Sequence, residues 1–410
     1  MNYFKWLLIF ILPINLFAQI FHTPPELAPY IEYAPEIISK AAVLIDAQTG
    51  ALLYSKNPDL EIPPASLAKL MTMHLVMKAV EEGRASLDEL VPITAESWAQ
   101  NQPRRSSLMF LEPGQTVTLR EIMLGLAVSS GNDAAVAAAL RLAPSVSIFS
   151  AMMTQEARNM GLHTTRFVDA SGISHLNRTT AAEFTLFCRN YLNMHPYSLE
   201  DFHSVLTFAY PLAANVQGRR QLNPRTITQN NGNILLRTFP GVDGLKTGYI
   251  GASGYNIALT AQRDQTRFIL VLLGAPSERG GSRIRAADST RLLEWAFDNF
   301  KTVYFTIDNK EKEELLTAPL WKGKENNIKL KLAGHLTFTS HVNRADKIKY
   351  EVVLPELLIA PILEGTSAGY LYITDEQGEL SRIPLVTAES GEKGNIFKRL
   401  WHSVLLLFKK

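Results

Sequence analysis

The 410-residue sequence is poor in the residues that several classes of protein require. Its one cysteine, Cys188, excludes an internal disulfide framework and a cysteine-based zinc site. Its nine histidines form no H-x-H or H-x-x-x-H pair, so we expect no metal site. With 41 basic and 39 acidic residues, the overall charge gives no reason to expect a nucleic-acid partner. An apolar fraction of 46% excludes a disordered chain, and the length suggests two or three domains.

The first residues, 1–18, have the layout of a secretory signal peptide. One positive charge lies within residues 1–5, an apolar run covers residues 6–17, and Ala18 offers a small residue for cleavage. The run is too short to span a bilayer comfortably, although an uncleaved anchor is the alternative interpretation. Both interpretations predict an exported protein, in the periplasm or on the outer face of the cytoplasmic membrane.

The last residues, 394–410, predict an amphipathic helix without acidic residues. Large apolar side chains recur at helical spacing, at Phe397, Leu400, Trp401, Val404, Leu405 and Phe408. Polar and basic residues fall on the other face, with Leu406 as the exception: Lys398, Arg399, His402, Ser403, Lys409 and Lys410. Such a helix either docks on the protein or anchors residues 395–410 at the inner-membrane surface.

Between these ends, strand patterns flank a long helical region. Residues 41–57 predict a hairpin, and residues 63–197 are mostly helical in pattern. Three further strands are predicted at 244–250, 255–261 and 267–273, and an amphipathic helix follows at 283–300.

This order of elements indicates an α+β fold for residues 36–300. We expect an antiparallel sheet with helices on its faces, together with a helical lobe. After residue 301 the sequence changes to short alternating runs. These predict a small all-β domain at residues 303–386.

The first motif that suggests chemistry is Ser66-Leu67-Ala68-Lys69. On a helix, Ser66 and Lys69 share a face, so a neutral lysine amine could take the proton of the hydroxyl. That requires the lysine pKa to fall from about 10.4 towards 7, through burial and a second cation nearby. The alternative is an exposed pair on a helix surface. The same pattern also occurs at Ser390-Gly391-Glu392-Lys393, in what looks like a linker.

Two more motifs follow in the chain. Ser130-Gly131-Asn132 could supply a proton relay and an amide that binds substrate, or it could be a helix N-cap. Lys246-Thr247-Gly248 lies in a predicted strand, where Lys246 could be the second cation and Gly248 would let a substrate backbone approach. The alternative is an exposed strand.

The three motifs together, S-x-x-K, S-x-N and K-T-G, are far more informative than any one of them. They lie in segments that resemble the low-molecular-mass penicillin-binding proteins, the serine-type D-alanyl-D-alanine carboxypeptidases of peptidase family S11. These segments are PPASLAKLMT (63–72), SLMFLEPG (107–114), SSGNDA (129–134) and VDGLKTG (242–248). The predicted β domain and basic tail are similar to the membrane-anchored branch, and the resemblance implies the penicillin-binding/β-lactamase-like transpeptidase fold.

The resemblance also implies a role for each matched residue. Ser66 would be the acylated nucleophile, Lys69 its general base and Ser130 a proton donor. The substrate would contact Asn132, Lys246, Thr247, Gly248, Tyr249 and Arg285. Backbone N–H groups of Ser66 and Tyr249 would form the oxyanion hole. The branch often has histidine where this chain has Tyr249, so only a backbone role is expected there. Arg285 either holds the terminal carboxylate of the substrate or is a surface arginine.

The implied function is removal of the terminal D-alanine from peptidoglycan stem pentapeptides, within cell-wall biogenesis and cell-shape maintenance. β-Lactams would acylate Ser66, and no cofactor or metal is implied. Three alternatives stay open: a D,D-endopeptidase, a β-lactamase, and an inactive module that binds the cell wall. The absence of an E-x-x-L-N segment between Asn132 and Lys246 counts against a class A β-lactamase.

Overall fold

The computed structural model describes residues 21–306, 310–345, 347–354 and 357–408. These form two compact units, one made of residues 21–24 and 31–297 and the other of residues 25–30 and 298–408. The predicted signal peptide, as well as Lys409 and Lys410, lies outside the described residues.

The first unit is built on a five-stranded antiparallel sheet with the order β2-β1-β9-β8-β7. Its strands are β1 (Ala41–Asp46), β2 (Leu52–Lys56), β7 (Val242–Ile250), β8 (Gly254–Arg263) and β9 (Thr266–Ala275). β1 pairs with β9 along its whole length, from Ala41↔Leu273 to Asp46↔Phe268. The predicted hairpin therefore joins the three predicted strands in one sheet, although about 190 residues of chain separate them.

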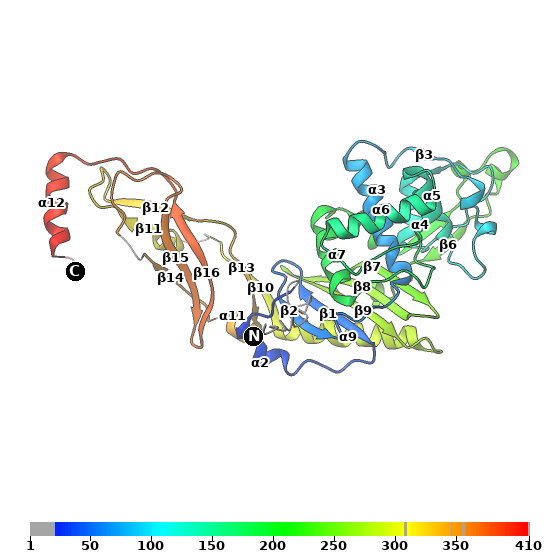
Figure 1. Cartoon of the computed structure of the whole chain (residues 1–410), viewed down its shortest axis with the longest axis horizontal. Helices are drawn as coiled ribbons and strands as arrows, with labels where there is room; N and C mark the ends of the chain where they lie inside the picture. Colours follow the sequence, from blue (N-terminus) through cyan, green and yellow to red (C-terminus); the bar gives the residue numbers. More distant parts are fainter. Residues whose placement is uncertain (1–20, 307–309, 346, 355–356, 409–410) are drawn as a thin grey trace, which may run out of the picture. The chain divides into compact units, whose positions relative to one another are not determined.

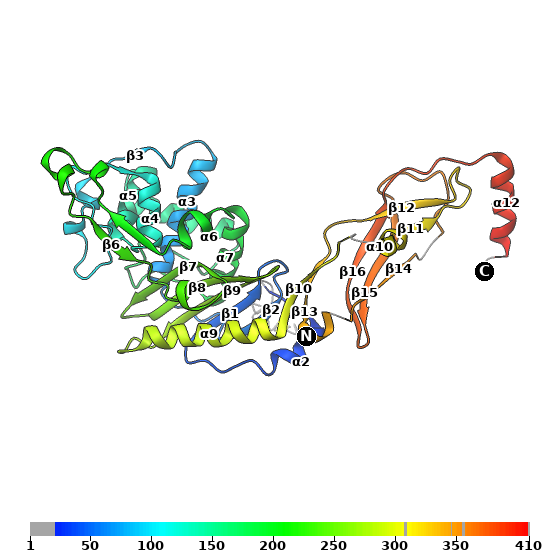
Figure 2. The ribbon, with the colours of Figure 1, turned by 180° about the vertical axis from the view of Figure 1, so that it is seen from behind.

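Helices cover both faces of this sheet, as Figures 1 and 2 show. One face carries α9 (Gly281–Asn299), where Phe297 packs against Phe268 of β9 at 4.7 Å between ring centroids. The helical lobe lies on the other face, where α7 packs against β1 and β9. Its helices are α3 (Lys69–Glu81), α4 (Leu119–Ala127), α5 (Asn132–Leu142), α6 (Val146–Asn159), α7 (Ala181–Met194) and the short α8 (Leu235–Thr238). The fold is the predicted α+β arrangement.

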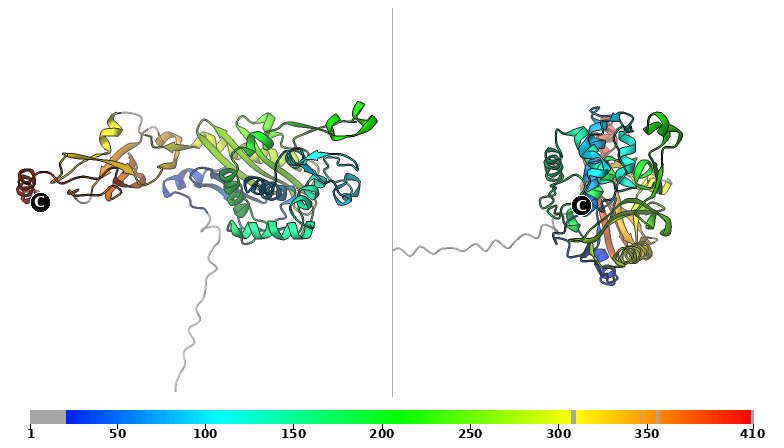
Figure 3. Two further views of the ribbon diagram at one scale, coloured as in Figure 1. Left: turned by 90° about the horizontal axis from the view of Figure 1, so that it is seen from above. Right: turned by 90° about the vertical axis from the view of Figure 1, so that its right-hand side faces the viewer.

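Short strand pairs complete the lobe. β3 (Leu90–Val91) pairs with β4 (Val117–Thr118), and β5 (Thr207–Tyr210) pairs with β6 (Ile227–Asn230). The segment between β5 and β6 projects from the lobe, as Figure 3 shows.

Side-chain caps fix where three helices of the lobe begin. Thr118 and Glu121 form a capping box at α4, while Ser145 and Thr180 cap α6 and α7. α5 differs, because Gly131 precedes it and no side chain caps its first turn. The polar residues next to Gly131 are therefore available for other contacts.

The second unit is the predicted all-β domain. Its main sheet has the order β11-β12-β16-β15-β14, and β10 pairs with β13 in a second small sheet. The strands are β10 (Phe300–Tyr304), β11 (Thr317–Pro319), β12 (Asn327–Leu332), β13 (Thr337–His341), β14 (Lys349–Val353), β15 (Ser367–Asp375) and β16 (Gly378–Thr387). The unit also contains α2 (Ala28–Ile31, of which residues 28–30 belong here), α10 (Lys310–Leu315) and α11 (Val342–Ala345). Leu371, Ile373 and Leu385 are fully buried in its apolar core.

The chain's last helix, α12 (Ile396–Leu407), contacts the β unit through its polar face. His402 Nδ1 accepts a hydrogen bond from the backbone N–H of Lys322 at 2.8 Å, and Lys398 Nζ donates to the carbonyl of Lys324 at 2.8 Å. No residue of α12 is buried, and Phe397 and Trp401 are 80% and 62% exposed. The helix therefore contacts the protein, as one of the two sequence alternatives expects, but large apolar side chains such as Phe397 and Trp401 stay exposed.

Within the described residues, no single helix is long and apolar enough to cross a membrane. The pair α5 and α6, bent by 85°, passes that test by length and composition only.

Candidate active site

Ser66 lies in a tight 3-10 turn, Ala65–Ala68, which leads directly into α3. Ala65 has a positive φ of 52°, a conformation that is strained for a residue with a side chain. Two glycines allow neighbouring segments to approach this turn. A Cβ on Gly172 would lie 1.8 Å from the Ala65 carbonyl oxygen, and a Cβ on Gly248 would lie 2.9 Å from the Ser66 nitrogen. Close packing from two sides therefore fixes the position of the serine.

Lys69 lies behind Ser66 and is completely buried. Its Nζ is 3.0 Å from Ser66 Oγ, 2.8 Å from Asn132 Oδ1 and 2.7 Å from the carbonyl oxygen of Ser171. The exposed helix-surface pair, the alternative for this motif, is wrong because the amine has no access to solvent.

Burial lowers the pKa of Lys69 from 10.5 to about 7, against the carboxylates of Asp169 and Asp133, which act to raise it. The sequence led us to expect both burial and a second cation as causes; the structure confirms burial, while the other main influences on this pKa are the two carboxylates. A neutral amine keeps two donors for Asn132 and Ser171 and offers its lone pair to the Ser66 hydroxyl. Lys69 can therefore accept the serine proton without leaving a buried polar group unsatisfied.

Lys246 and Ser130 form a second amine–hydroxyl pair across the cleft. Lys246 Nζ donates to Ser130 Oγ at 3.0 Å, and only 3% of Lys246 is exposed. Burial and the positive charges on Lys69 and Arg285 hold the pKa of Lys246 well below its usual range. Ser130 itself has a φ of 54°. The exposed strand, the alternative for the third motif, is wrong because Lys246 is buried. The S-x-N motif does lie at a helix start, with Gly131 as the N-cap of α5, but no side chain caps that helix.

Two carboxylates, the buried Asp133 and the half-buried Asp169, hold the loops around the site, and sequence reasoning gave neither of them a role. Asp133 accepts hydrogen bonds from the backbone N–H groups of Met109, Phe110 and Leu111. Asp169 accepts from those of Ser171, Gly172 and Ser174. The pattern Asp-x-Ser-Gly at 169–172 is a signal for a turn held by an aspartate, and it could have pointed to the second loop.

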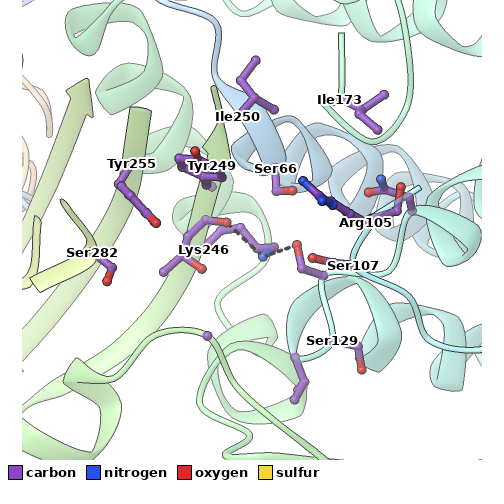
Figure 4. Close-up of a pocket in the computed structure, with 18 of the residues that line it drawn as sticks. Ser66, Arg105, Ser107, Ser129, Ile173, Lys246, Tyr249, Ile250, Tyr255 and Ser282 are labelled. Carbon is purple, nitrogen blue, oxygen red and sulfur yellow. Dashed lines mark hydrogen bonds between the residues drawn. The ribbon is translucent and has the colours of Figure 1, made fainter. Parts of the chain in front are cut away.

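These elements surround a cleft of about 660 Å³. Figure 4 shows Ser66, Lys246 and Tyr249 facing it. All the predicted site residues line the cleft except Lys69, which lies beneath Ser66: Ser66, Ser130, Asn132, Lys246, Thr247, Gly248, Tyr249 and Arg285. The side chain of Tyr249 is 46% exposed and packs against Tyr255 at 4.3 Å between ring centroids.

Arg285 is buried rather than a surface residue, since only 6% of it is exposed. Its Nη1 donates to the carbonyl oxygen of Asn256 at 3.3 Å, and its Nε has no hydrogen-bond partner among the described residues. Burial lowers the pKa of Arg285 to about 10, so the group stays positively charged at neutral pH. A buried guanidinium with a free donor at the edge of a cleft can bind an anion.

The geometry fits a class of protein, the serine acyl-transfer enzymes in which a buried lysine can act as the base. The comparisons with known proteins agree. Residues 29–277 match the family model described as D-alanyl-D-alanine carboxypeptidase, Peptidase_S11, and residues 300–393 match the model for the C-terminal domain of penicillin-binding protein 5.

Two relatives are similar over most of their length. The chain is 32% identical to D-alanyl-D-alanine carboxypeptidase DacD of Escherichia coli (strain K12), with 92% of each chain covered. It is 33% identical to DacD of Salmonella typhimurium, with 94% of this chain and 95% of the relative covered. Among solved structures, penicillin-binding protein 5 from Haemophilus influenzae matches with a TM-score of 0.72 and 28% identity, over 88% of this chain and 99% of that one.

The chain therefore belongs to the S11 peptidases, as a serine-type D-alanyl-D-alanine carboxypeptidase with a penicillin-binding protein 5 C-terminal domain. An inactive wall-binding module, one of the sequence alternatives, is not supported.

Proposed function

We propose that this enzyme removes the terminal D-alanine from peptidoglycan stem pentapeptides through an acyl-enzyme on Ser66. The observation that carries the proposal is the fully buried Lys69, with its pKa lowered to about 7 and its Nζ 3.0 Å from Ser66 Oγ. A base with a pKa near the working pH is the most effective kind of general base.

In the acylation step, neutral Lys69 takes the hydroxyl proton while Ser66 Oγ attacks the carbonyl carbon between the two D-alanines. The oxyanion then faces the backbone N–H groups assigned to Ser66 and Tyr249. The close approach of β7 at Gly248 supports this assignment, because it brings the strand next to the Ser66 nitrogen.

When the C–N bond breaks, the leaving amine needs a proton. Ser130 supplies it from its hydroxyl and regains one from Lys246 Nζ, 3.0 Å away. After acylation, Lys69 carries one additional proton and Lys246 carries one fewer. The charge within the cleft is therefore unchanged apart from the loss of D-alanine.

Deacylation reverses this path with water in the place of the amine. Water gives a proton through Ser130 to Lys246, and the water oxygen attacks the ester carbon. Ser66 Oγ then leaves and takes the proton from Lys69. Both lysines then return to their starting states. Asn132 holds Lys69 through Oδ1 in each step, and Arg285 binds the terminal carboxylate of the peptide.

β-Lactams should acylate Ser66 by the same attack on the amide carbonyl. The amine released from the ring stays attached to the acyl group, where it blocks the position that water needs. Among the described residues that line the cleft, none is an aspartate or glutamate that could activate a second water. We therefore expect a long-lived adduct rather than the rapid turnover of a β-lactamase.

The test is incubation with a pentapeptide that ends in D-Ala-D-Ala, followed by identification of the products. Release of free D-alanine and a tetrapeptide supports the carboxypeptidase. Cleavage of a cross-linked dimer with no release from the pentapeptide would favour the D,D-endopeptidase instead. Rapid hydrolysis of a chromogenic cephalosporin would favour the β-lactamase.

We also propose that the protein is exported and lies at the outer face of the inner membrane, anchored by residues 395–410. Support comes from α12, whose large apolar side chains Phe397, Leu400 and Trp401 are all more than half exposed. Its polar face contacts the loop at Trp321, where His402 packs edge-on against the indole ring. The apolar face thus points to solvent in the isolated chain, as an interfacial helix requires.

Vesicle flotation tests the anchor. The chain should float with vesicles that contain anionic lipid, and a Leu400→Glu/Trp401→Glu variant should stay in solution. Release of D-alanine from a soluble pentapeptide should be the same for both proteins, because α12 is not part of the cleft. Equal flotation of the two proteins would contradict the anchor.

A further inference from the structure

Four basic side chains line the cleft. Lys246 and Arg285 belong to β7 and α9, while Arg104 and Arg105 belong to a loop of the helical lobe. Among the described residues that line the cleft, none is acidic. The terminal carboxylate of the peptide can be the ligand of Lys246 and Arg285, but it leaves Arg104 and Arg105 without a ligand.

Arg104 and Arg105 are available for binding. Both side chains are exposed, and no described residue forms a hydrogen bond or an ion pair with either guanidinium. Other arginines of the same unit are already paired, for example Arg141 with Glu89 and Arg267 with Asp243. Two adjacent guanidinium groups without an anion repel each other, so an anionic ligand would be favourable here.

The loop that carries this pair is fixed at its C-terminal side. The backbone N–H of Asn132 donates to the Ser107 carbonyl at 2.8 Å, and Asp133 holds the backbone of the next residues through Met109 N at 2.8 Å. Arg105 has a φ of 63°, which only a well-supported loop maintains for a residue with a side chain. The two arginines are therefore positioned relative to the S-x-N motif that faces Ser66.

The direction of the substrate follows from the positions of the two pairs. In Figure 4, Arg105 lies on one side of Ser66. Ser282, which comes one turn before Arg285 on α9, lies on the other side of Ser66. If the terminal carboxylate binds at Arg285 and the scissile carbonyl lies at Ser66, the residues before D-Ala-D-Ala extend towards Arg105.

We propose that Arg104 and Arg105 form an anionic subsite for a free carboxylate on one of the residues before D-Ala-D-Ala. This inference rests on the proposed function and refines its substrate class to stem peptides with an unamidated acidic residue. A guanidinium and a carboxylate match in shape as well as charge, because two parallel N–H···O hydrogen bonds can form. Since the pair is exposed, we expect about a tenfold preference rather than an absolute requirement.

The experiment compares synthetic peptides that end in D-Ala-D-Ala and carry either Glu or Gln at the first or second position before it. The wild-type enzyme should hydrolyse the Glu peptide with about tenfold higher kcat/KM at one of these positions, and high salt should reduce this preference. In an Arg104→Gln/Arg105→Gln variant the ratio should fall towards one. The ratio is measured on one preparation, so it does not depend on the fraction of folded enzyme.

The control is Arg158→Gln, which removes an exposed arginine of α6 outside the cleft and should keep the preference. Equal hydrolysis of both peptides by the wild type, or an unchanged preference in the double variant, would overturn the subsite while leaving the carboxypeptidase intact. No hydrolysis of either peptide would instead contradict the proposed function, and the subsite would fall with it.

Discussion

The chain contains the pattern S-x-x-K twice, and the two copies differ in every property that matters for chemistry. Ser66 and Lys69 lie at the start of a helix, with the amine buried and 3.0 Å from the hydroxyl. Ser390 and Lys393 are exposed and lie in the second unit, outside its regular helices and strands. There the Ser390 hydroxyl accepts a hydrogen bond from the backbone N–H of Glu364.

The comparison shows that the motif supplies only the two reacting groups. A helical turn places residues i and i+3 on the same face, whereas in extended chain they point to opposite faces. Burial then has to remove the charge from the lysine, which it does for Lys69 but not for an exposed side chain. We therefore expect the fold around the motif to make one copy reactive and to leave the other inert.

The largest difference between the two copies is expected when the serine of each motif is replaced by alanine. Ser66→Ala should abolish both D-alanine release and covalent labelling by fluorescent penicillin, because the variant lacks the hydroxyl next to the Lys69 amine. Ser390→Ala should keep both activities at the wild-type level. Labelling that persists in Ser66→Ala would show that the two copies had been assigned the wrong way round.

Substitution of the lysine should distinguish the two copies of the S-x-x-K motif almost as clearly as substitution of the serine. Lys69→Arg places a permanent positive charge at this position and cannot act as a base, so the acylation rate should fall by about a thousandfold. Lys393→Arg should have no effect. Stopped-flow measurement of penicillin acylation gives both rates, and near-normal acylation by Lys69→Arg would exclude Lys69 as the base.

The pH dependence tests the electrostatic part of the comparison. Only the neutral form of Lys69 accepts a proton, and its pKa is about 7, so acylation should slow as the pH falls through this value. About two pH units below that pKa, roughly 1% of the amine is neutral and the rate should drop about a hundredfold. A rate that stays flat from pH 5 to 8 would contradict a lowered pKa.

A smaller effect is expected from the packing that fixes Ser66. In Gly248→Ala the new Cβ would meet the Ser66 nitrogen at 2.9 Å and the Pro64 oxygen at 3.0 Å, so the strand must move away. We expect about a tenfold slower acylation. Gly334→Ala is the matched control in the second unit, where a Cβ meets nothing within 4 Å. Equal rates for the two variants would show that close approach of β7 is not needed.

Sequence patterns predicted the strands of the main sheet and α9 well, because their apolar periodicity is strong, whereas the helices of the lobe were predicted only as one mostly helical region and the second unit only as a small all-β domain. That the three motifs lie together in one site was predicted from the resemblance to a family, and not from the spacing of the residues. Local patterns could not show that Ala65 and Ser130 would adopt positive φ, or that Asp133 and Asp169 would hold the loops. Those features depend on contacts between segments that lie far apart in the chain.

The relative weight of the two expected causes of the low lysine pKa was beyond the sequence. Burial and a second cation were both expected; burial lowers the pKa of Lys69, and the effect of neighbouring cations is seen on Lys246. Burial is a property of the packed fold, and no spacing of residues reports it. Arg285 makes the same point, since it resembles a surface arginine in sequence and is nearly buried in the structure.

The most direct test is peptide mapping of the full chain after reaction with penicillin. We predict a single adduct, on the peptide that contains Ser66, and an unmodified peptide around Ser390. An adduct on Ser390, or an unmodified Ser66 after complete loss of activity, would contradict the central claim that burial and helical geometry make only one of the two motifs reactive.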